Sequence, residues 1–143
     1  MQSSNHITVQ TTVNAPIERV WDFWVSPGRI QEWNHASPDW HCPSATNDLR
    51  VGGEFHYVMA AKDGSIDFDF NGMYTEVTTL SRIAYSIQDG RTVVVTFEPT
   101  DEGVVVTETF EMEHENSAEM QKGGWQAILE NFKRCVEAES NEA

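Results

Sequence analysis

One carboxylate in this sequence falls on an apolar strand face, where its chemistry would differ from that of a surface acid. Glu108 has the same strand phase as its apolar neighbours Val104, Val106, Phe110 and Met112. Because a strand has a period of two, these side chains share one face. A carboxyl group there would be desolvated, its pKa would rise, and it could serve as a general acid or base. A bulge that turns it outward, or an ion pair with Arg91 or another basic group, would give it a structural role instead.

A second candidate group lies in the segment 34–48, which fits neither the helical nor the strand period and predicts a long loop. Loops with large residues often border a site, so Trp40 is predicted as a ligand contact and His41 as a group that titrates near neutral pH. A surface or capping histidine, and a tryptophan that closes one end of the core, are the simpler alternatives. His35 and Asp39 lie nearby, but their spacing with His41 is not a zinc pattern, so we expect no metal and no cofactor.

Large apolar and aromatic side chains are expected to face inward around these groups. Core packing is the simpler role for each of them, but together they would suit an apolar or aromatic ligand. Tyr57 and Tyr74 could also offer it a hydroxyl group. No nucleophilic triad or paired-carboxylate motif can be read from the spacing of residues. Besides Trp40, the predicted ligand contacts are Phe55, Tyr57, Met59, Phe70, Tyr74, Phe97, Phe110, Trp125, Leu129 and Phe132.

The element that must position these residues is a helix near the end of the sequence. Apolar residues in the segment 123–137 recur with a period near 3.6, which predicts one apolar stripe. The stripe has to be buried, and the strands before it offer the only large apolar surface. Gly123 and Gly124 predict either a close approach of the backbone to a strand or a ligand, or a bend before the helix proper. The stripe consists of Trp125, Ile128, Leu129, Phe132 and Val136.

The rest of the chain predicts an antiparallel sheet with two short helices after its first strand. Alternation over 7–13 predicts the first strand. Asn14 and Pro16 predict the start of a helix that ends before Pro27, and a second short helix is predicted to reach Trp33. Later alternating segments end in Asp-Gly turns, which make neighbouring strands antiparallel. The predicted fold class is α+β, with a curved antiparallel sheet of about six or seven strands around the C-terminal helix and a pocket between them.

The composition indicates an acidic globular protein. The 143 residues are 39% hydrophobic, enough for a packed core, and we expect one domain over 1–143 with its core at about 7–137. The net charge is −14, and eight acidic residues lie between Glu98 and Glu119 without a Lys or Arg, so we expect no binding to nucleic acid or membranes. We recognise no signal peptide or membrane span. Cys42 and Cys135 lack a metal or redox spacing, and a cytoplasmic location is expected.

Several segments in this order resemble the START-like, birch-pollen-allergen-like superfamily, which has the helix-grip fold. The resemblance is strongest to the branch related to the activator of heat-shock-protein-90 ATPase, often grouped with polyketide cyclases, and it covers about residues 7–136. It implies a curved antiparallel sheet that grips the C-terminal helix, with an apolar cavity between them, and it carries no single catalytic motif. The segments are 14–16 (NAP) with Val20 and Trp21, Trp33, 48–55 (DLRVGGEF), 72–77 (GMYTEV) and 124–129 (GWQAIL).

Three functions follow as hypotheses. The first is binding of a small hydrophobic or aromatic molecule between the sheet and the C-terminal helix. The second is a cyclase, dehydratase or hydrolase reaction that uses Glu108 with His41 or a tyrosine. The third is a protein-interaction module that regulates a chaperone ATPase or another partner through the acidic face. A homodimer is compatible with each of them.

Overall fold

The computed structural model describes residues 6–35, 38–87, 90–113 and 117–141. Its elements follow the predicted order of strand, two short helices, successive strands and a long helix. In chain order they are β1 (His6–Val13), α1 (Ile17–Val25), α2 (Pro27–Trp33), β2 (Trp40–Asn47), β3 (Glu54–Ala61), β4 (Asp67–Thr78), β5 (Arg82–Ile87), β6 (Thr92–Thr100), β7 (Gly103–Glu111) and α3 (Ala118–Asn141).

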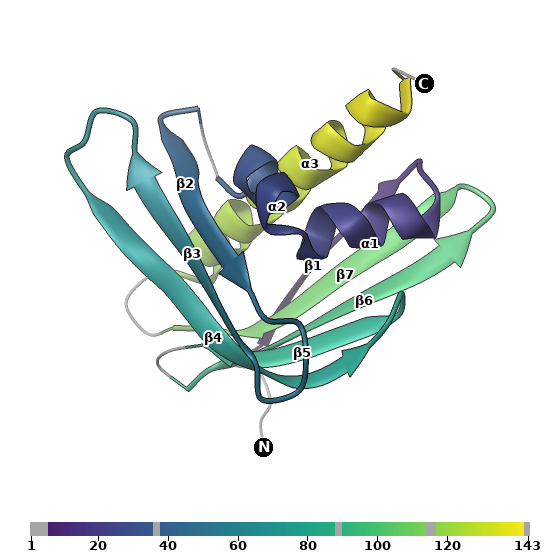
Figure 1. Ribbon diagram of the computed structural model, residues 1–143, viewed down its shortest axis with the longest axis horizontal. Helices are drawn as coiled ribbons and strands as arrows, with labels where there is room; N and C mark the ends of the chain where they lie inside the picture. Colours follow the sequence, from purple (N-terminus) through teal and green to yellow (C-terminus); the bar gives the residue numbers. More distant parts are fainter. Residues whose placement is uncertain (1–5, 36–37, 88–89, 114–116, 142–143) are drawn as a thin grey trace.

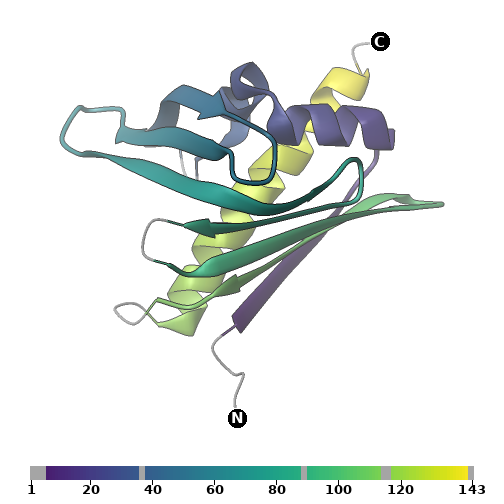
Figure 2. The ribbon, with the colours of Figure 1, turned by 60° about the horizontal axis from the view of Figure 1, so that its bottom comes forward.

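All the strands form one antiparallel seven-stranded sheet in the order β1-β7-β6-β5-β4-β3-β2. The sheet curls into a half-barrel, as Figures 1 and 2 show. Register shifts bend it between β4 and β5, at Tyr74 and Glu76, and between β2 and β3. Such bulges increase the local twist of a strand pair and let a sheet close around a partner. The predicted fold class, the helix-grip fold, is confirmed.

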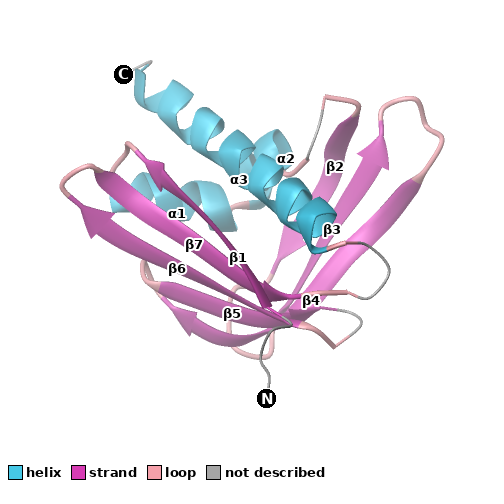
Figure 3. Ribbon diagram, turned by 180° about the vertical axis from the view of Figure 1, so that it is seen from behind, coloured by secondary structure: helices cyan, strands magenta, loops and turns pink. Residues whose placement is uncertain are grey.

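The helix α3 lies across the concave side of this sheet (Figure 3), and its apolar stripe packs into the core. Leu129, Phe132 and Val136 are completely buried. The polar side of the helix is also engaged, because Lys133 donates a hydrogen bond of 2.6 Å to the carbonyl oxygen of Thr12 in β1. The helices α1 and α2 lie over the open side of the half-barrel, next to α3 (Figures 1 and 3).

The prediction of a loop over 34–48 is wrong for its second half, because Trp40–Asn47 forms the edge strand β2. Pro43 has no backbone N–H and lies within the irregular pairing between His41 and Ser44. Proline is tolerated at bulges and on edge strands, because its missing N–H does not remove a hydrogen bond between paired strands there. The Pro residue and the bulge together hide the strand period from a reading of the sequence alone.

Two smaller predictions at helix ends also need correction. The residue that precedes the first turn of α1 is Pro16 rather than Asn14, and no side chain caps that end. The backbone N–H of Asn14 instead donates a 2.8 Å hydrogen bond to the Glu137 carboxylate of α3. Gly123 and Gly124 lie inside α3, and a Cβ atom at either position would meet nothing within 4 Å. They therefore do not mark a close approach of backbones.

Candidate functional site

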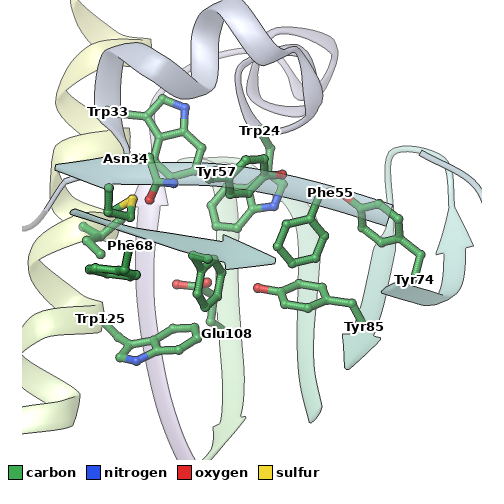
Figure 4. Close-up of a pocket in the computed structure, with 13 residues that line it drawn as sticks. Trp24, Trp33, Asn34, Phe55, Tyr57, Phe68, Tyr74, Tyr85, Glu108 and Trp125 are labelled. Atoms are coloured by element: carbon green, nitrogen blue, oxygen red, sulfur yellow. The ribbon is translucent and has the colours of Figure 1, made fainter. Parts of the chain in front are cut away.

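A pocket of about 220 Å³ lies between the concave face of the sheet, α3 and the two short helices. Its walls are mostly aromatic, and they come from β3, β4, β5, β7, α1, α2 and α3. Figure 4 shows how these side chains converge. The lining residues are Trp24, Trp33, Asn34, Phe55, Tyr57, Met59, Phe68, Phe70, Tyr74, Tyr85, Glu108, Trp125 and Ile128.

Glu108 brings a carboxyl group into these apolar surroundings. It lies on β7 opposite Val9 of β1 and Val95 of β6, and only 5% of its surface is exposed. Within the described parts of the chain, no hydrogen bond or ion pair reaches this carboxyl group. Burial raises the pKa of Glu108 to about 8, because the charged form is desolvated. The group is therefore mainly a neutral carboxylic acid at pH 7.

Tyr85 is the polar neighbour of Glu108 in the pocket. In Figure 4 its hydroxyl group and the Glu108 carboxyl group point toward one another. Burial raises the pKa of Tyr85 well above its usual value, and the negative charge that Glu108 can carry raises it further. The Tyr85 hydroxyl thus keeps its proton near neutral pH and can donate or accept a hydrogen bond.

Two further tyrosines lie side by side on another wall of the pocket, and Tyr74 is fixed by hydrogen bonds. The Tyr57 and Tyr74 hydroxyl groups are neighbours, which adds to the effect of burial in raising the pKa of Tyr57. Tyr74 donates to Oδ1 of Asn47 at 2.5 Å, and Nδ2 of Asn47 donates to the carbonyl oxygen of Val25 at 2.7 Å. Burial raises the pKa of Tyr74 to about 12, so these hydroxyls also stay protonated. The hydrogen bonds through Asn47 tie this wall of the pocket to the end of α1.

The tryptophans of the pocket are held by ring packing and one hydrogen bond. Trp24 stacks on Trp33 with ring centroids 5.0 Å apart, and Nε1 of Trp33 donates to the carbonyl oxygen of Phe23 at 2.8 Å. On the opposite wall, Trp125 of α3 stacks on Phe110 at 3.9 Å. Offset and stacked aromatic pairs restrict the rings beyond simple burial. The pocket is therefore preformed by its own walls.

Six of the predicted ligand contacts line the pocket, and four lie behind it. Phe97, Phe110, Leu129 and Phe132 are at most 4% exposed and belong to the packed core. They face inward as their periods require, but other side chains separate them from the open volume. The six that line the pocket are Phe55, Tyr57, Met59, Phe70, Tyr74 and Trp125.

The structure does not bring Trp40 and His41 into the pocket lining. Both lie half-buried on the edge strand β2. The Trp40 ring packs edge-on against Phe68, with centroids 6.1 Å apart, so it supports a lining residue from outside. Because the predicted loop is a paired strand, the direction of each side chain is fixed by the β2–β3 register rather than by proximity to the site.

His35 and Asp39, the residues predicted to lie near His41, do not form a site with it. His35 follows α2, and its Nε2 accepts a 2.8 Å hydrogen bond from Nδ2 of Asn131, which ties α2 to α3. Asp39 is exposed. Across the described ranges, no group of three His, Cys, Asp or Glu side chains is placed to hold a metal ion. No helix in those ranges is both long and apolar enough to cross a membrane.

Sequence reasoning missed several pocket residues, although some of them carry a readable signal. Tyr85 has the same strand phase as its buried neighbours Ile83 and Ile87, and Ile128 belongs to the stripe of α3. The signal for Trp24 and Trp33 is weaker, because each lies on a short helix whose docking position the local period does not give. Phe68 has the same strand phase as Phe70 and Tyr74 on β4, so its inward direction could be read from the alternation. Asn34 carries no signal, since it reaches the pocket only through the packing of α2.

Comparisons with known proteins agree with this architecture. A family model described as Activator of Hsp90 ATPase homolog 1-like protein matches residues 14–137. The solution structure of an AHSA1-like protein from Aeromonas hydrophila is 44% identical, with a TM-score of 0.90 over 94% of each chain. A solution structure from Cytophaga hutchinsonii is 47% identical, with a TM-score of 0.81 over 97% of this chain and 96% of the other.

More distant solved structures share the fold alone. A crystal structure from Nitrosomonas europaea is 21% identical and has a TM-score of 0.83 over 99% of each chain. Among curated proteins, the comparison gave no match.

Proposed function

This chain belongs to the family of Activator of Hsp90 ATPase homolog 1-like proteins, and we propose that it binds a small apolar or aromatic molecule between α3 and the sheet. The observation that carries the proposal is the preformed pocket of about 220 Å³ with aromatic walls. Binding sites for small molecules are typically apolar concavities with a few placed polar groups. In this pocket Glu108, Asn34 and the hydroxyl groups of the tyrosines take that role.

The size of the pocket limits the ligand. An apolar cavity of about 150 Å³ takes up benzene. A pocket of about 220 Å³ therefore suits a molecule of one or two rings, or an apolar body of similar size. Larger molecules would have to extend past Phe68, whose side chain is 48% exposed.

The direct test is a binding screen with a variant that fills the pocket. Three lining residues, Trp24, Trp33 and Trp125, make intrinsic fluorescence a readout for one- and two-ring compounds. We expect hits for the wild type, and we expect Ile128→Phe, which places a larger side chain on the α3 wall, to bind them at least about tenfold more weakly. Mass spectrometry under native conditions would identify any molecule that copurifies with the protein.

Ile66→Phe is the matched control for this screen. Ile66 is 57% exposed at the turn between β3 and β4, away from the pocket lining. It should bind the same compounds with wild-type affinity. A wild-type protein that binds no member of a hydrophobic and aromatic library, or an Ile128→Phe variant with full affinity, would contradict the proposal.

A second candidate function is acid–base catalysis on the bound molecule, such as a cyclisation, dehydration or hydrolysis. The observation that favours it is the position of Glu108, a buried carboxyl group without a described hydrogen-bond partner at the edge of open volume. A group whose pKa lies near the working pH can both take and give a proton, and such catalysis is worth about 10²–10⁴-fold in rate. Tyr85 is placed to share that proton.

The catalytic candidate is tested by incubating an identified ligand with protein and following its mass. We expect conversion by the wild type and a loss of about 100-fold or more in Glu108→Gln, which keeps the shape but cannot exchange the proton. Glu102→Gln, an exposed acid in the β6–β7 turn, is the control and should convert the ligand at the wild-type rate. Equal conversion by Glu108→Gln would remove Glu108 from any such reaction.

A further inference from the structure

The charge pattern of the pocket is one-sided. Of the 13 residues in the described lining, Glu108 is the one acid, and that lining holds no Lys, Arg or His. Glu108 as a whole is only 5% exposed, and no hydrogen bond or ion pair from a described residue reaches its carboxyl group. A buried acid that lacks an internal counter-ion can accept one from a ligand.

We propose that the pocket selects a small organic cation, an amine or quaternary ammonium group on an apolar or aromatic body, with Glu108 as its counter-ion. This inference rests on the proposed function, because it names the class of ligand for the same pocket. The cationic group would lie beside the Glu108 carboxylate, and the apolar body would occupy the space between the aromatic walls.

The aromatic walls favour a cation over a neutral ligand of the same shape. Trp24 and Trp33 on one side and Trp125 on the other present indole rings, which are the strongest cation–π partners among side chains. Aromatic cages of this kind bind quaternary ammonium groups in other proteins. An anionic ligand would find no basic partner in the described lining and would be repelled by Glu108 once ionised.

The charge of the whole molecule points the same way. The net charge of −14 creates a negative potential that concentrates cations near the surface and repels anions. Long-range attraction of this kind raises the association rate, and the buried acid then supplies the specific contact. Both effects act in the same direction for an organic cation.

The proton on Glu108 makes binding depend on pH in a defined direction. The pKa of about 8 means that the empty pocket mostly holds the neutral acid at pH 7, so a cation must displace that proton. The titratable group next to Glu108 is Tyr85 from β5, and Tyr74 from β4 and Tyr57 from β3 line the same pocket. The raised pKa values of these tyrosines keep them neutral throughout. The flanking Val9 and Val95 and the α3 residues Trp125 and Ile128 carry no charge. Affinity for a permanent cation should therefore rise with pH up to about 8 and then level off.

The test uses two probes of nearly the same shape, phenyltrimethylammonium and tert-butylbenzene, which differ in charge alone. Dissociation constants are measured for the wild type, for Glu108→Gln and for Glu102→Gln at about pH 6 and about pH 9. We expect the cation to bind the wild type and Glu102→Gln about 100-fold more tightly at the higher pH, because the ionised fraction of Glu108 grows by roughly that factor. Glu108→Gln should lose this gain, while tert-butylbenzene should bind none of the three proteins more tightly at the higher pH, because it offers no charge to the ionised carboxylate.

The outcomes separate the inference from the proposed function. Binding of tert-butylbenzene as tight as that of the cation at both pH values overturns the inference and leaves a pocket for neutral molecules. A preference for the cation that persists unchanged in Glu108→Gln also overturns it. If neither probe binds the wild type, the inference is overturned, whereas the proposed function fails only if the library screen described above also finds no ligand.

Discussion

When the pH is raised from about 5 to about 8, we expect the unfolding free energy of the wild-type protein to fall by about 3 to 4 kcal/mol relative to that of the Glu108→Gln variant. The reason is the pKa of Glu108, which is about 8 in the folded protein against the usual 4.5 of a solvated glutamate. Between these two values the folded state holds a proton that the unfolded state has released, so stability falls as the pH rises. Above about 8 both states are ionised and the loss is complete.

The measurement is chemical denaturation of both proteins at several pH values, with the difference between them plotted against pH. Taking the difference cancels the titration of the other acids and histidines. Glu102→Gln serves as the control, because this exposed residue should leave the pH profile of the wild type unchanged. Parallel profiles for Glu108→Gln and the wild type would mean that the Glu108 carboxyl group is solvated or paired in the folded protein.

Replacing Phe132 by alanine will reduce the unfolding free energy by about 3 to 5 kcal/mol. Phe132 is completely buried on the stripe of α3, and its ring packs edge-on against Trp24 and Trp33, with both centroid distances 4.9 Å. Its loss leaves a cavity behind two walls of the pocket, which the stiff indole rings cannot fill by moving. We expect those walls to loosen, so that pocket ligands bind more weakly as well.

Phe68→Ala is the matched control, since it removes the same atoms from a side chain that is 48% exposed. We expect it to lower the unfolding free energy by less than about 1.5 kcal/mol, because much of this ring is already in water. Denaturant titration of the two variants measures the difference. Equal losses would show that α3 does not seal the half-barrel through Phe132.

Local periods in the sequence determined most of the elements. The stripe from Trp125 to Val136 predicted the long helix, and alternation predicted the strands, because the period of an element is set by its own backbone geometry. The same rule gave the face on which Glu108 lies. It failed for β2, where Pro43 and a bulge remove the alternation from an edge strand.

The pocket itself was decided by the tertiary structure. Phe97 and Phe132 have the same inward phase as Phe55 and Phe70, yet only the latter two reach open volume. The period of an element predicts which of its side chains point inward. It does not predict which other side chains lie between them and the pocket. Trp24, Trp33 and Asn34 enter the lining because α1 and α2 dock over the half-barrel, a contact between residues far apart in the chain. The sequence by itself thus determined which residues turn inward. Packing between distant segments decided which of them meet a ligand and left Glu108 without a described partner.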